Sequence, residues 1–191
     1  MNKGRLEAFS DGVIAVIITI MVLEMKPPQG AGIEALRPNI PVFLSYVLSY
    51  IYIGIYWSNH HHLMHAAKHV NGAVLWANLH LLFWLSLVPF ATTWMGENTL
   101  APTPVAVYGA VLLLAGIAYF ILTRTLIRFH GQDSVLATSI GADVKGKASL
   151  VIYATAILLA FARPLISCAC YVLVALMWLV PDRRIERRIS E

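Results

Sequence analysis

The first 28 residues constrain the fold of this chain more than any other stretch. Residues 5–28 read RLEAFSDGVIAVIITIMVLEMKPP, and 13–23 contain no charge. At 1.5 Å per residue, a helix of about 20 apolar residues crosses the hydrocarbon core of a bilayer. Pro27 and Pro28 cannot continue a helix. The sequence therefore begins with a predicted membrane-spanning helix over about 5–25.

Apolar residues also dominate the rest of the chain. Of its 191 residues, 59% are hydrophobic and 13% are charged, a balance far from that of a soluble domain. Stretches rich in glycine, proline and charge divide the sequence into six apolar segments. The predicted spans are about 5–25, 40–61, 73–95, 105–129, 148–162 and 165–180. We therefore expect an all-α integral membrane protein, with one six-helix domain over 1–181 and a basic tail over 182–191.

Lysine and arginine are distributed unevenly among the predicted loops. If the N-terminus is cytoplasmic, the opposite side holds three cations: Lys26, Arg37 and Arg163. The cytoplasmic side then holds the other eleven: Lys3, Arg5, Lys68, Arg124, Arg128, Lys145, Lys147, Arg183, Arg184, Arg187 and Arg188. This bias satisfies the positive-inside rule, so we expect a multi-pass protein of the cell membrane with both termini cytoplasmic. The tail is expected at anionic lipid headgroups rather than on nucleic acid.

A helical wheel divides the first helix into two faces. The stripe, as we call it, covers a sector of roughly 80–100° and comprises Phe9, Gly12, Val16, Thr19, Ile20 and Leu23. Asp11 lies roughly 130° from the middle of the stripe. An unpaired carboxylate at membrane depth costs several kcal/mol, and Arg5 has the wrong spacing for an ion pair with Asp11 on one helix. The polar partner of Asp11 is therefore expected on another helix.

Histidines cluster at the end of the second predicted span, in 56–69. His61, His65 and His69 are spaced to line one helical face, which would suit a metal ion or a proton relay. Histidines at a helix end can instead cap carbonyl groups or bond to a carboxylate such as Asp11. Because no acidic residue stands near them in sequence and the chain has two cysteines, we expect no dedicated metal site.

The third predicted span carries polar residues at the same depth as Ser10 and Asp11. These residues are Asn71, Asn78 and His80. Hydrogen bonds between helices in a membrane contribute about 0.6–2 kcal/mol each, so we expect them to hold the first helix at a fixed rotation. The sequence shows no paired carboxylates, nucleophile with a base, or phosphate loop, and we expect no enzyme activity.

Four motifs follow one another in the first half of the chain: Arg5-x-x-x-Phe9-Ser10-Asp11 with its apolar run, Tyr56-Trp57-x-x-His60-His61, Leu75-Trp76-x-Asn78-Leu79 and Leu87-x-Pro89-Phe90. Together they resemble the transmembrane protein 175 family of lysosomal and prokaryotic potassium channels. Their order and separations make the resemblance specific in the first half. The second half is similar in its pattern of three further spans.

The resemblance implies a homotetramer of six-helix subunits around a pore lined by the first helix. The family's narrow hydrophobic ring falls on Val16, with further pore-lining positions at Thr19, Ile20 and Leu23. No TVGYG-like filter segment is present. The expected permeants are K⁺ and other monovalent cations, with membrane lipids as partners and no cofactor or metal.

The resemblance also implies a hydrogen-bond network that joins the first three helices. Its expected members are Arg5, Phe9, Ser10, Asp11, Trp57, His60, His61, Trp76 and Asn78. The family usually has a bulkier Ile or Leu at the ring, so Val16 predicts a wider constriction. His62 extends the usual histidine pair and has no assigned role.

Three functions remain to be compared at this point. The first is a potassium-permeable cation channel with a hydrophobic constriction, which the motifs favour. The second is a proton- or metal-coupled transporter that uses the cluster from His60 to His69. The third is a membrane scaffold that conducts no ions. Ion flux through purified protein in liposomes distinguishes them.

Overall fold

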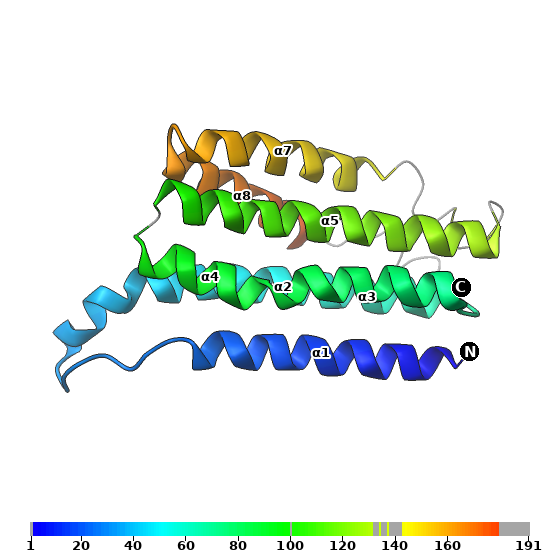
Figure 1. Cartoon of the computed structure of the whole chain (residues 1–191), viewed down its shortest axis with the longest axis horizontal. Helices are drawn as coiled ribbons and strands as arrows, with labels where there is room; N and C mark the ends of the chain where they lie inside the picture. The colour runs from blue at the N-terminus through cyan, green and yellow to red at the C-terminus, as the bar shows by residue number, and fades with distance from the viewer. Residues whose placement is uncertain (1, 100, 132–133, 135–136, 138–142, 180–191) are drawn as a thin grey trace.

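The helices of this protein run back and forth along one long axis (Figure 1). The computed structural model describes residues 2–99, 101–131, 134, 137 and 143–179. The elements are α1 (Lys3–Leu23), η1 (Ile33–Asn39), α2 (Ile40–Ala66), α3 (Gly72–Ser86), α4 (Val88–Glu97), α5 (Pro102–His130), α7 (Val144–Ala160) and α8 (Pro164–Leu179). The described residues contain no strand. The predicted all-α architecture is confirmed.

Four helical segments are long and apolar enough to cross a membrane, judged by length and composition. They are Lys3–Leu23, Ile33–Ala66, Gly72–Glu97 and Pro102–His130. The last two predicted spans correspond to α7, with 17 residues, and α8, with 16. Successive spans reverse direction, so α1 begins at the end of the bundle where α2 and α5 finish (Figure 1). The chain is a multi-pass membrane protein.

The predicted helix boundaries differ from those of the structure most in the second and third spans. The second span was expected to end at 61, but α2 continues to Ala66. The third was expected as one helix over 73–95, but it is divided at Leu87 into α3 and α4. Pro89 lies in the first turn of α4. Because proline has no backbone N–H and its ring clashes with the preceding turn, the ladder of α3 cannot continue through it.

The bundle places α1 at one edge, where it packs on α2, α3 and α4 (Figure 1). On the other side of this layer, α5 packs on α3 and α4, and α7 packs on α5 and α8. Hydroxyl groups join the inner helices. The Ser49 Oγ lies 2.7 Å from the Thr92 Oγ1 and 3.0 Å from the Tyr108 hydroxyl. Each of these buried groups thus has a polar partner, as a membrane interior requires.

A small residue permits the close approach of α2 and α4. A Cβ added at Gly96 would lie 2.7 Å from the Val42 Cα, and backbone cannot move aside as a flexible side chain can. We predict that Gly96→Ala destabilises the protein by about 1–3 kcal/mol, because overpacking pushes the helices apart. Thermal denaturation followed by size-exclusion chromatography in detergent measures the loss.

The matched control for this substitution is Gly54→Ala in α2. A Cβ at Gly54 meets nothing within 4 Å. The control should keep the melting temperature of the parent or raise it, because alanine favours a helix over glycine. Equal melting temperatures for the two variants would contradict the proposed close contact.

Candidate functional site

The rotation of α1 within the subunit is fixed by one buried face. The buried residues of α1 recur every three or four positions: Leu6, Ser10, Ile14, Ile17 and Met21. This spacing places them on one side of a helix, which packs against α2, α3 and α4. The Asn2 side chain begins the helix by accepting a hydrogen bond from the Gly4 N–H at 3.0 Å.

The stripe lies on a different side of α1, where no other helix that the structure describes covers it. Its large apolar members are exposed to 52% at Phe9, 55% at Val16, 41% at Ile20 and 78% at Leu23. Gly12 and Thr19 are exposed as well. Such a continuous exposed apolar strip on a helix indicates contact with lipid or with another protein surface. The subunit itself therefore provides no cover for the stripe.

The hydroxyl of Thr19 is oriented by its own helix. Its Oγ1 lies 2.7 Å from the Ala15 carbonyl oxygen and 3.0 Å from that of Val16, and it donates its proton to them. A hydroxyl that has used its proton in this way keeps oxygen lone pairs for another donor or a cation. The exposed stripe therefore carries one side-chain oxygen, that of Thr19, which can accept a hydrogen bond or contact a cation.

Three buried side chains connect α1 to α2 and α3. The Asn78 Nδ2 donates to the Ser10 Oγ at 2.9 Å, and the Asn78 Oδ1 lies 2.7 Å from the His60 Nε2. Because the Asn78 oxygen can only accept, the His60 Nε2 must carry the proton. The Ser10 Oγ in turn donates to the Leu6 carbonyl at 2.8 Å. Ser10 and Asn78 are fully buried and His60 is 2% exposed, so these bonds are shielded from solvent.

Asp11 finds its polar partner on α2. The Trp57 Nε1 donates to the Asp11 Oδ1 at 3.0 Å. The ring of Trp57 also stacks on His61, with centroids 6.0 Å apart and planes at 27°. The carboxylate thus has a partner on a neighbouring helix, and that partner is an indole rather than a histidine.

Three of the predicted network residues do not join these contacts within one subunit. Trp76 is 73% exposed, on the side of α3 away from Asn78. Arg5 and Phe9 are also exposed, and no ion pair of Arg5 is formed with the part of the chain that the structure describes. Two residues along a helix are about 200° apart, which is why Trp76 and Asn78 cannot share a face.

The histidine face predicted across 61, 65 and 69 is wrong because α2 ends at Ala66. The rings of His61 and His65 do stack, with centroids 6.2 Å apart. The centroid of the His62 ring lies 5.7 Å from that of His61. His69 follows the helix in the connection to α3. Within the described ranges, no group of three or more His, Cys, Asp or Glu is placed to hold a metal ion.

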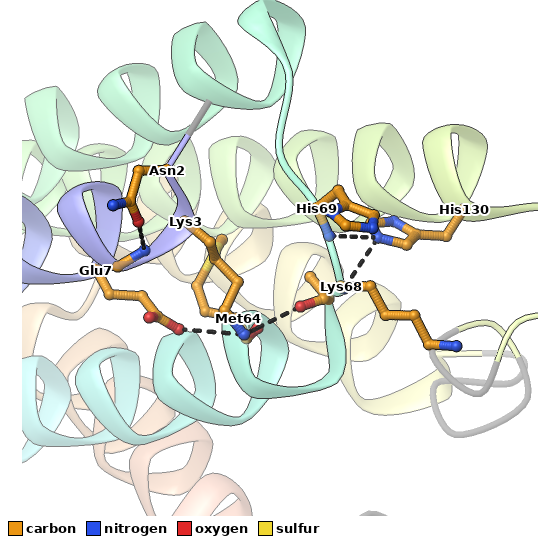
Figure 2. Close-up of polar contacts among 9 residues, drawn as sticks. Asn2, Lys3, Glu7, Met64, Lys68, His69 and His130 are labelled. Carbon is orange, nitrogen blue, oxygen red and sulfur yellow. Dashed lines mark hydrogen bonds and ion pairs between the residues drawn. The ribbon is translucent and has the colours of Figure 1, made fainter.

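Two polar contacts near this connection were missed by sequence reasoning. The Lys3 Nζ donates to the carbonyl oxygens of Met64 and Ala67, each at 3.0 Å (Figure 2). The His130 Nε2 accepts from the backbone N–H of Lys68 at 3.1 Å and of His69 at 3.3 Å (Figure 2). Both contacts join residues about 60 positions apart in sequence, and no local pattern signals them.

Comparison with known proteins identifies the family. Residues 5–89 match the profile described as "Endosomal/lysosomal potassium channel TMEM175". The chain is 53% identical over 191 residues to a potassium channel of Chryseobacterium sp. (strain P1-3), and the match covers 100% of both chains. The chain belongs to the TMEM175 family. A potassium channel of Streptomyces collinus is 36% identical over 138 residues, which cover 65% of this chain and 67% of that protein.

A solved TMEM175 structure has the same fold. It is the crystal structure of a lysosomal potassium-selective channel TMEM175 homologue from Chamaesiphon minutus. The two chains share 27% sequence identity with a TM-score of 0.81, and the match covers 93% of this chain and 96% of the other. These TMEM175 relatives are named as channels and not as enzymes. The profile match over 5–89 includes Ser10, His60 and Asn78.

The bridging position of Asn78 predicts a large effect of its removal. In Asn78→Leu, the His60 Nε2 and the Ser10 Oγ each lose a partner inside a membrane bundle. We expect a loss of about 1–3 kcal/mol of stability, which thermal denaturation in detergent measures.

His80→Leu provides the control on the same helix. His80 is exposed, and its Nε2 accepts a hydrogen bond from the Trp84 Nε1 at 2.9 Å. Its loss should be the smaller one, because this substitution leaves one group without a partner, the Trp84 Nε1, whereas Asn78→Leu leaves two buried groups unpaired. A control as destabilised as Asn78→Leu would rule out a special role for the buried bridge.

Proposed function

We propose that this protein is a potassium-permeable cation channel in which the stripe of α1 faces the ion path. The observation that carries the proposal is the orientation of α1. Its buried face is fixed by apolar packing and by the bond from Asn78 to Ser10, and the stripe is thereby turned out of the subunit. The potassium channels that resemble this chain support the same function.

The stripe can enclose a pore only when several copies assemble. We infer a homotetramer, in which four α1 helices surround one axis and cover each other's exposed apolar residues. Four copies of Val16 would form a ring without a donor or acceptor. A cation passing this ring must keep its water or lose solvation energy, so the ring is a hydrophobic constriction. The Thr19 oxygen, about one turn further along α1, can replace part of the lost water.

The same proposal includes an orientation in the membrane. Lys68 follows the end of α2, Arg124 and Arg128 lie in the last turns of α5, and Lys145 and Lys147 lie in the first turn of α7. All five therefore belong to the end of the bundle where α1 starts (Figure 1). Lys26, Arg37 and Arg163 lie in or beside the connections at the opposite end. By the positive-inside rule the start of α1 faces the cytoplasm, as does the end of α8. The basic tail over 182–191 lies outside the described residues.

Ion flux through purified protein in liposomes tests the function. An imposed potassium gradient should drive K⁺ uptake that depends on membrane potential and needs no proton or metal gradient. Flux that requires a proton or metal gradient would favour the transporter. If a correctly assembled protein shows no flux, the remaining function is a membrane scaffold that conducts no ions.

The ring position gives a sharper prediction. Val16→Asn should raise the single-channel current by wetting the constriction, and Val16→Leu should lower it while sharpening selectivity by narrowing the ring. Currents and reversal potentials in planar bilayers measure both effects.

Val22→Asn is the matched control. Val22 is also an exposed valine of α1, at 43%, but it lies outside the stripe. Its substitution should leave conductance close to that of the parent. If Val22→Asn changes the current and Val16→Asn does not, α1 is rotated from the orientation proposed.

Thr19→Val separates selectivity from flux. The substitution preserves the shape of the side chain and removes the hydroxyl oxygen. We expect the preference among monovalent cations to fall more than the total current, because the constriction itself is unchanged. Reversal potentials under K⁺ and Na⁺ gradients measure the preference. A larger loss of current than of preference would contradict the role assigned to the hydroxyl.

A further inference from the structure

The connection between α2 and α3 is held from two sides. On one side, Lys3 at the start of α1 caps the end of α2 through the Met64 and Ala67 carbonyls (Figure 2). The ammonium also lies 3.7 Å from the Glu7 carboxylate, one turn along α1. A cation is favourable at a helix C-terminus, where carbonyl groups lack partners within the helix. The first turn of α1 is therefore tied to this connection.

On the other side, His130 at the end of α5 holds the next two backbone amides. The Nε2 faces the N–H groups of Lys68 and His69 (Figure 2). The Nδ1 lies 2.9 Å from the Leu126 carbonyl. An N–H can only donate and a carbonyl can only accept, so these contacts require one state of the ring. It must be the neutral imidazole with its proton on Nδ1.

Protonation of this ring would remove both hydrogen bonds that the Nε2 accepts from Lys68 and His69. A proton on Nε2 would point at two N–H donors, so the acceptor is lost and like partial charges face each other. Histidine is the side chain that ordinarily changes charge between about pH 5 and pH 8. The contact is therefore present while the ring is neutral and is lost when the ring is protonated.

Among the residues that the structure describes, the surroundings of His130 offer little compensation for a positive ring. The connection contributes Lys68 and His69, and α5 itself contributes Arg128. The first turn of α3 is uncharged. On α7, the Asp143 carboxylate interacts with Arg124, more than one turn before His130, and the nearby lysines of α7 are cationic. On α1, Glu7 is paired with Lys3.

We propose that residues 64–69 form a proton-operated latch between α1 and α5, closed when His130 is neutral and released when it is protonated. The latch couples the pH on the side of the membrane where α1 begins to the position of the first turn of α1. Its effect on conduction rests on the proposed channel function. When the connection is released from α5, the first turn of α1 is tied by Lys3 to a less rigid support, so acid on that side lowers the current.

Hydrogen exchange of the amides in 64–71 tests the latch without any need for conduction. Once corrected for the intrinsic effect of pH, protection in the parent protein should fall about tenfold between about pH 8 and pH 5, which corresponds to about 1.4 kcal/mol, because two N–H donors share one nitrogen lone pair and contribute less than two separate hydrogen bonds. In His130→Phe, protection should be low at both values. His130→Gln, which keeps an uncharged acceptor, should remove the pH-dependent step even where its protection is weaker.

Two further variants separate the latch from general effects. His65→Gln, on the exposed side of α2, should retain the step of the parent protein. Lys3→Met should lower protection at both pH values and leave the step in place, because His130 is intact. An unchanged step in both His130 variants, or its loss in His65→Gln, would overturn the latch.

Bilayer currents test the coupling separately. Acid on the side of the N-terminus should reduce the parent current about fivefold, within the range of ordinary allosteric coupling, and should leave the His130→Gln current unchanged. A protection step with pH-independent current would overturn the coupling. If no variant conducts under any condition, the proposed function fails, and hydrogen exchange still decides whether the latch exists.

Discussion

The structure depends on one constraint, which is that every polar group inside a membrane bundle needs a partner. Asn78 meets this requirement for two other helices at once, because it donates to Ser10 on α1 and accepts from His60 on α2. Apolar packing alone holds a helix at the edge of the bundle less firmly in a bilayer than in water, because its apolar side chains can exchange contacts with neighbouring helices for contacts with lipid tails. The hydrogen bond has direction, and it selects one rotation of α1.

The chemical pattern of the first helix could be predicted from the sequence because its period is local. The stripe and the face of Asp11 follow from 100° per residue, and the structure places them on different sides of α1. The need for a partner of Asp11 on another helix was also predictable, since no residue of α1 had suitable spacing. The identity of that partner, Trp57, was not, because two side chains on different helices meet only after the helices have packed.

The remaining differences have equally physical causes. A family motif contains Trp76 and Asn78 together, but their separation along α3 sends them to different sides. The histidine pattern assumed a helix through 69, whereas the chain leaves the helix after Ala66. Lys3 and His130 act on backbone atoms, and an amide or carbonyl carries no mark in the sequence that shows it will receive a side chain.

The restraints on α1 are unequal along its length, and this inequality bears on where the helix can move. Its first half is held by the cap from Lys3, by the Ser10 bridge and by the Trp57 contact with Asp11. Beyond its end, the Lys26 Nζ pairs with a Glu97 oxygen at 2.9 Å, but both side chains are exposed and water screens such a pair. Between these points α1 is held by the apolar packing of Ile17 and Met21, and the Thr19 hydroxyl bonds to its own helix rather than to another. Small rotations of α1 are therefore easiest in its second half, which carries Thr19, Ile20 and Leu23. Of the four predicted pore-lining residues, Val16 lies closest to the restrained first half and is expected to move least.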